Sequence, residues 1–105
     1  EFLDDRDFKD VSIVDTEDGS FKIEFVLNSD GSSILQDVTT RYRGRRMVIF
    51  SNFGDPRYLG APKIERTISD GIVQITPDAS REEAERFVLG MKNTIRQLKR
   101  KDFGL

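Results

Sequence analysis

The sequence predicts an α+β domain with a mostly antiparallel sheet of about five strands and two helices packed on one face. The expected order is strand, strand, helix, three strands, helix. Apolar residues alternate with polar ones over residues 21–27, the period of a half-buried strand. They recur every three or four residues over 84–98, the period of an amphipathic helix. At 105 residues and 36% apolar content the chain can build one core, so we expect residues 1–105 to form a single domain.

The first two strands are expected at Asp10–Asp15 and Phe21–Leu27. In the second, every other residue is apolar and the residues between are mostly charged, which places one face on a core. Asp18 and Gly19 between the two strands favour a tight turn. The pair should therefore form an antiparallel hairpin.

A helix is expected next, at about Ser32–Tyr42, with Gly44 where a helix end needs a left-handed residue. It is followed by a short strand at Arg46–Ser51. Because Met47 to Phe50 form an uninterrupted apolar run, this strand is expected to be central and buried on both faces.

The rest of the sheet is expected from two extended stretches, Tyr58–Ile68 and Ile72–Thr76. Pro62 cannot donate a hydrogen bond to a neighbouring strand, so an edge or a bulge should lie there. The last helix should begin at the capping box of Ser80 and Glu83 and run to about Lys101.

The chain lacks the residues on which most enzymes depend. It contains no His and no Cys, which removes the usual general base, thiolate nucleophiles and zinc-thiolate sites. The acidic run Asp4-Asp5-Arg6-Asp7 lacks the spacing, the central Gly and the terminal Glu of a calcium loop. We therefore expect no catalytic residues, no metal site and no cofactor. The alternative, an enzyme, would need a metal ion such as Mg²⁺ or Ca²⁺ held by carboxylates alone.

Charge is distributed unevenly. Residues 1–40 carry eleven acidic and three basic side chains, net −8, whereas residues 41–105 carry eight and fourteen, net +6. Four arginines, Arg41, Arg43, Arg45 and Arg46, fall within six residues and could contact an anionic partner such as RNA. The alternative is that they cap and solubilise a helix end, and on this interpretation no nucleic acid is expected.

The candidate binding residues are apolar and lie in a segment of otherwise loop-like composition. They are Phe53, Pro56, Tyr58 and Leu59. Exposed aromatic residues beside a strand edge can receive an extended polypeptide. The alternative is that the segment folds inward and that Phe53 packs against the base of its own hairpin.

A series of short motifs spans most of the chain. In the second half they are Gly60-Ala61-Pro62-Lys63-Ile64, Ile68, Gly71, Gln74-Ile75-Thr76 and Ser80-x-x-Glu83-Ala84. In the first half they are Asp7, Val11, Asp18-Gly19, Phe25-Val26-Leu27-Asn28, Gly31, Thr39 or Thr40, and Gly44 to Ile49. In this order they resemble the head region of the first extracytoplasmic (periplasmic) domain of the SecD/SecDF protein-export accessory family.

The resemblance implies a noncatalytic extracytoplasmic domain that binds unfolded or exported polypeptide during protein translocation, with the Sec translocase as a further partner. It also implies attachment to a membrane only through a tether outside this chain, and we expect a monomer. The chain departs from the family pattern in a longer loop at residues 51–59 and in a final helix that continues to Lys101. The rival hypothesis is an α+β domain that binds RNA or an anionic surface through Arg41 to Arg46.

Overall fold

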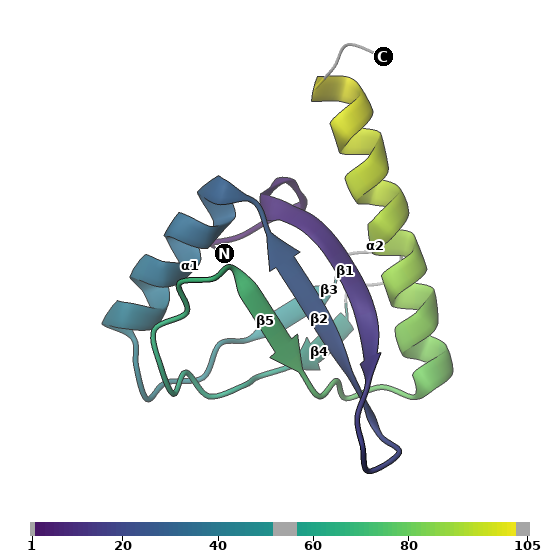
Figure 1. Cartoon of the computed structure of the whole chain (residues 1–105), viewed down its shortest axis with the longest axis horizontal. Coiled ribbons are helices and arrows are strands. Elements are labelled where there is room, and N and C mark those ends of the chain that lie inside the picture. Colours follow the sequence, from purple (N-terminus) through teal and green to yellow (C-terminus); the bar gives the residue numbers. More distant parts are fainter. Residues whose placement is uncertain (1, 52–56, 103–105) are drawn as a thin grey trace.

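The computed structural model describes residues 2–51 and 57–102. The elements, in chain order, are the short 3₁₀ helix η1 (Asp5–Asp7), β1 (Phe8–Asp15), β2 (Phe21–Leu27), α1 (Ser29–Arg41), β3 (Ile49–Ser51), β4 (Arg57–Gly60), β5 (Ile72–Ile75) and α2 (Arg81–Asp102). This confirms the α+β class and the expected order of strands and helices (Figure 1).

The main sheet has three antiparallel strands in the order β1-β2-β5. The expected hairpin of β1 and β2 is confirmed, and Gly19 takes the left-handed conformation, φ 84°, that its turn requires. Phe25 of β2 lies opposite Val11 on one side and Val73 on the other. These three buried side chains share one face of the sheet, so that face carries the core.

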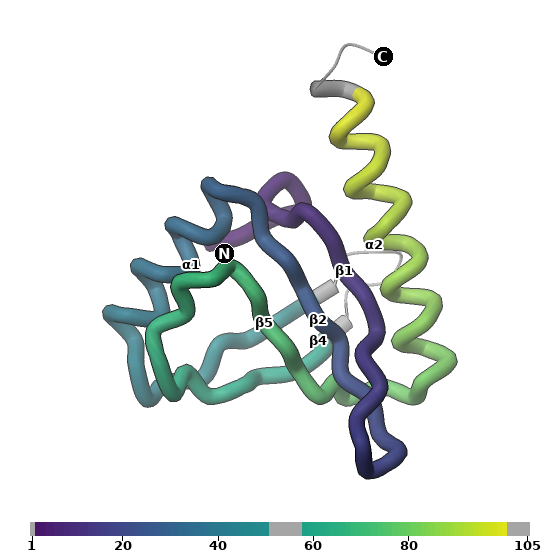
Figure 2. Tube along the Cα trace, in the orientation of Figure 1, coloured from purple at the N-terminus to yellow at the C-terminus, as the bar shows by residue number. Residues whose placement is uncertain are grey.

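The other two strands form a separate antiparallel sheet, β3-β4, which passes behind the main sheet in the view of Figures 1 and 2. The prediction of a central strand buried on both faces at Arg46–Ser51 is wrong. β3 pairs with β4 alone among the described strands, and Val48 and Phe50 are 56% and 62% exposed. An uninterrupted apolar run does not reveal whether its alternate side chains will be covered.

A bulge and a bridge make this hairpin irregular. Ile49 lies opposite Gly60 and Phe50 opposite Tyr58, so Leu59 is the extra residue on β4. Its carbonyl accepts a hydrogen bond from Asp78 N, beyond β5, at 2.8 Å. The expected break near Pro62 is present, since the ladder continues past it only as a single bridge between Arg46 and Lys63.

Both helices have side-chain caps. Asn28 caps α1 by accepting a hydrogen bond from Gly31 N, and the helix begins at Ser29, three residues before the expected start at Ser32. The predicted capping box of α2 is confirmed, because Ser80 N donates to Glu83 Oε1 and Glu83 N donates to Ser80 Oγ. Gly44, just after α1, has the expected left-handed conformation, φ 90°.

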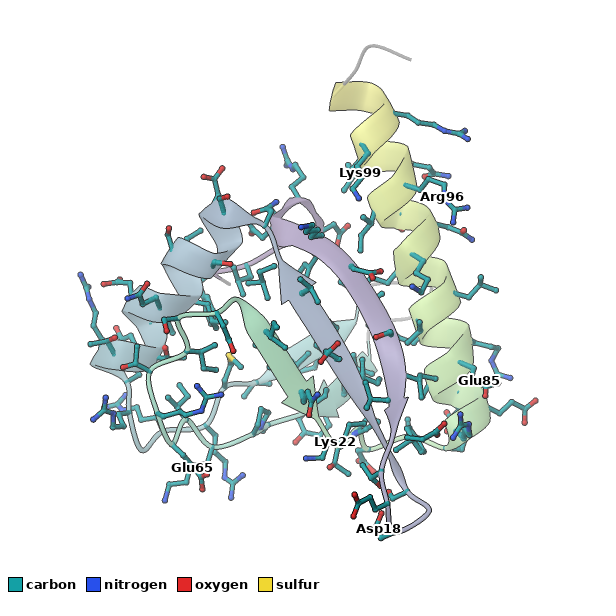
Figure 3. All side chains as sticks on the ribbon, viewed as in Figure 1. Asp18, Lys22, Glu65, Glu85, Arg96 and Lys99 are labelled. Atoms are coloured by element: carbon teal, nitrogen blue, oxygen red, sulfur yellow. The ribbon has the colours of Figure 1, made fainter. Side chains whose placement is uncertain are left out.

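One core joins the two helices to the sheet. Leu35 of α1 and four residues of α2 are buried against the inner face of the main sheet, and Leu59 joins them from the hairpin. The buried α2 residues are Ala84, Val88, Met91 and Ile95. α2 lies antiparallel to β1 and its last turns extend beyond the sheet, where Figure 3 labels Arg96 and Lys99. Within residues 2–51 and 57–102, no helix has the length and apolarity that a membrane crossing requires.

Candidate functional site

An apolar pocket of about 440 Å³ lies between the main sheet, α2, the β3-β4 hairpin and the N-terminal segment. Its lining residues are Phe2, Leu3, Asp4, Asp5, Phe8, Phe25, Leu27, Leu35, Met47, Val48, Ile49, Phe50, Leu59, Val73, Phe87 and Met91. Fourteen of these sixteen are apolar. A pocket of this size and composition suits an apolar ligand group.

The interior of the pocket is part of the core. Phe25 of β2 packs against Phe8 and Phe87, with ring centroids 5.6 and 6.2 Å apart. Leu59 is only 2% exposed, and the bulge on β4 directs it inward. The packing of the core therefore fixes the side chains that line the interior of the pocket.

The mouth of the pocket carries apolar side chains that remain exposed. Phe50 and Tyr58 lie opposite each other in the hairpin, with ring centroids 6.0 Å apart and planes at 72°. Val48 and Phe2 line the pocket and are also exposed. An exposed apolar group beside an apolar pocket is typical of a surface that binds a partner.

The N-terminal wall is fixed by hydrogen bonds. Asp4 caps η1 by accepting from Arg6 N at 2.9 Å, while Asp4 N donates to Asp7 Oδ2 at 2.8 Å. Asn28 then joins η1 to α1, because its Nδ2 donates to Arg6 O at 2.7 Å and its N donates to Asp7 O at 2.9 Å. The acidic run is thus an exposed and ordered rim of the pocket.

Two of the four candidate residues can be placed. Leu59 lines the pocket, and Tyr58 stands beside it, 42% exposed and in contact with Phe50. Phe53 and Pro56 lie outside the described residues, so their part in the site stays a prediction.

Sequence reasoning missed the pocket residues Val48, Phe50 and Phe2. The apolar run predicts a buried central strand for the first two. The one sequence signal for an exposed strand is the loop-like composition directly after Ser51. Phe2 had no local signal at all, because it reaches the site only through the fold.

The four arginines make separate contacts within the domain. Arg41 pairs with Asp37 at 3.1 Å and Arg43 donates to Thr67 at 3.1 Å. Arg45 lies over the ring of Tyr42, 5.7 Å from its centroid, and Arg46 donates to the carbonyl of Ala61 at 2.8 Å. All four are exposed, but these contacts are ones expected of the end of a helix and of the hairpin that follows it.

Ion pairs join α2 to β1, and their residues do not line the pocket. Arg81 pairs with Asp15, and Lys92 pairs with Asp10 at 3.1 Å. Partial burial raises the pKa of Asp10, but hydrogen bonds from Val11 N and Lys92 and the nearby lysine charges outweigh it, so the pKa lies below its ordinary value. Over the described part of the chain, no three acidic side chains gather closely enough to hold a metal ion.

Comparison with known proteins gives one consistent result. The family model described as "SecDF, P1 head subdomain" matches residues 1–94. The protein translocase subunit SecD of Acidaminococcus fermentans is 29% identical over 88 residues, covering 84% of this chain and 20% of that protein. The chain thus spans a fifth of that relative's length.

Two solved structures are also similar. One is of SecDF, described as a membrane component that enhances protein export, and it is 27% identical with a TM-score of 0.73 over 86% of this chain and 40% of that chain. The other is SecDF in a super-membrane-facing form, with the same identity and TM-score over 86% of this chain and 12% of that chain. The resemblance seen in the sequence is confirmed, and the chain belongs to the SecDF P1 head subdomain family.

Proposed function

We propose that this domain binds extended segments of unfolded polypeptide outside the cytoplasm, as a noncatalytic part of SecD- or SecDF-type protein export. Membership of the P1 head family supports the role in export and the location. The observation that carries polypeptide binding is the apolar pocket whose mouth is formed by the exposed Val48 and Phe50. Residues 1–105 would act as one domain, as a monomer, and in proximity to the Sec translocase.

The proposed site consists of residues at the apolar pocket together with the candidate binding residues predicted from the sequence. Val48, Phe50 and Tyr58 would contact the bound segment at the mouth, and Leu59 would contact it in the interior. We propose Phe53 and Pro56 as further contacts, since they follow β3 directly in the chain. Because one apolar cluster must serve many exported sequences, the expected affinity is weak, about tens of micromolar or about −6 kcal/mol.

The test measures binding of fluorescently labelled, reduced and alkylated ribonuclease A, which cannot fold. Replacing Val48 and Phe50 together with Ser should weaken binding at least about tenfold, which is about 1.4 kcal/mol. Leu89→Ser is the matched control, because Leu89 is 63% exposed on α2 but does not line the pocket. The proposal would be contradicted if Leu89→Ser lost as much affinity as the double variant. It would also be contradicted if the double variant kept its affinity while its circular dichroism spectrum showed an intact fold.

A further inference from the structure

We infer that the polypeptide binds as a strand added to the free edge of β3, with an apolar side chain in the pocket and a lysine or arginine beside Asp4 and Asp5. The inference rests on the proposed function and names the class of segment that the site selects. That class is an extended run of apolar residues flanked by basic ones.

The pocket is lined by β3 and by the two residues before it. Met47 and Val48, directly before β3, and Ile49 and Phe50 of β3 all line the pocket, although successive side chains of an extended chain point to opposite faces. Met47 and Ile49 pack toward the core, whereas Val48 and Phe50 face solvent. The pocket is therefore lined from both faces of this segment, which is the arrangement expected if it passes along the edge of β3.

That edge has no partner among the described strands. β4 occupies one side of β3, and within residues 2–51 and 57–102 no second strand pairs with the other side. An unpaired edge presents a row of backbone N–H and C=O groups to an incoming chain. Backbone pairing is independent of sequence, and alternate side chains of the added strand would face the apolar pocket.

The charge at the rim of the pocket favours a basic flank on the bound segment. Asp4 and Asp5 are the charged residues that line the pocket in the part of the chain the structure describes. The α2 residues that line it are Phe87 and Met91, while Lys92, about 100° further round the helix, pairs with Asp10 on β1. The rim therefore favours a cationic flank on the bound segment and disfavours an anionic one.

The carboxylate of Asp4 is held in place by the fold. Asp4 is fixed by the capping box of η1, and η1 is fastened to the start of α1 through Asn28. A carboxylate already positioned by the fold loses less conformational freedom when a cation binds it. Asp4 and Asp5 remain exposed, so the effect is a preference among segments rather than the main source of affinity.

The charge preference is tested with labelled peptides that share a Val-Phe-Val centre and are flanked on both sides by Lys, Gln or Glu. At low salt the Lys-flanked peptide should bind about tenfold more tightly than the Glu-flanked one, and salt should reduce this ratio. Asp4→Asn with Asp5→Asn should bring the ratio close to one, and Asn at position 4 preserves the cap. Asp37→Asn with Glu65→Gln removes the same charge away from the pocket and should leave the ratio unchanged.

Strand addition is tested by methylating alternate backbone nitrogens of the Lys-flanked peptide. Methylation of the set that faces β3 should weaken binding about tenfold or more, whereas methylation of the opposite set should not, because alternate N–H groups point to opposite edges. Equal effects of the two methylation patterns would overturn strand addition.

The remaining outcomes separate this inference from the proposed function. Equal affinity for the Lys- and Glu-flanked peptides overturns the charge preference, and polypeptide binding still stands if the Gln-flanked peptide binds and Phe50→Ser weakens it. Binding of none of the peptides overturns both proposals. A dimer in analytical ultracentrifugation that Phe50→Ser abolishes would assign the edge to a second copy of the chain and overturn the inference.

Discussion

Phe25 shows how one side chain serves both the fold and the pocket. It is buried on β2, contacts Phe8 and Phe87, and forms part of the pocket lining. Its position in the alternating run of residues 21–27 is what predicts its burial from the sequence.

Phe25→Ala should therefore lower the free energy of unfolding by about 3 kcal/mol, the low end of the usual range because the ring already borders a pocket. Urea denaturation followed by circular dichroism measures this loss. Phe50→Ala is the matched control, since the same truncation at an exposed ring should cost well under half as much. A loss below about 1 kcal/mol at Phe25 would mean that this face of β2 is not the core face.

Thr39 is a buried polar residue whose hydroxyl has two tasks. It donates to Leu35 O at 2.8 Å within α1 and accepts from Ile68 N at 3.0 Å. The second bond joins α1 to the extended stretch before β5, and nothing local in the sequence predicts it.

Thr39→Val keeps the shape but leaves the Ile68 N–H without this acceptor, which should cost about 1–3 kcal/mol. Thr39→Ser keeps the hydroxyl and serves as the control. Hydrogen exchange gives the specific readout, since the Ile68 amide should lose protection in the Val variant and retain it in the Ser variant. Equal protection in the two variants would show that the bond does not form.

At the scale of elements, the close contact between α1 and η1 determines where Asp4 and Asp5 lie at the rim of the pocket. A Cβ added to Gly31 would meet the Asp7 carbonyl oxygen at 2.5 Å and Leu27 Cδ2 at 3.1 Å. The φ of Gly31 is not positive, so its backbone conformation does not require glycine. Glycine is required because η1 approaches too closely for a side chain.

Gly31→Ala should destabilise the domain by about 1–3 kcal/mol, although the same change in an unobstructed helix would stabilise it by about 1 kcal/mol. Ser33→Ala, at an exposed position two residues further along α1, is the control for helix propensity. Thermal denaturation of both variants separates the two effects. A rise in melting temperature for Gly31→Ala would contradict the contact with η1.

The pair of Asp10 and Lys92 links α2 to β1 and predicts a pH dependence. The folded state lowers the pKa of Asp10 below 3.8, so the pairing stabilises the fold above about pH 4 and is lost as pH falls through the lowered pKa. Asp10→Asn should cost about 0.2–1 kcal/mol at pH 7, the range for exposed ion pairs, and less at pH 2, where part of this stabilisation is lost. Urea denaturation at the two pH values measures this, and an equal loss at both would show that charge is not the cause.

At the scale of the whole molecule, the sequence predicts the elements far better than it predicts the site. The alternation in β2 and the helical spacing in α2 depend on local patterns, and both elements lie where those patterns place them. The placement of β3 could not be predicted, because Met47 to Phe50 would look the same in a central strand. The pocket joins Phe2, Phe50 and Met91, which only the packing of separate elements brings together.

The central claim is that the pocket beside β3 receives unfolded polypeptide. The most direct measurement is a titration of the isotopically labelled 105-residue chain with reduced and alkylated ribonuclease A, followed by amide chemical shifts. The claim predicts that the largest changes fall at Met47 to Phe50, at Leu59 and in the N-terminal segment from Phe2 to Asp5. Changes confined instead to Arg96 to Arg100 on α2, or to Arg41 to Arg46, would contradict it, and the second result would favour an anionic partner.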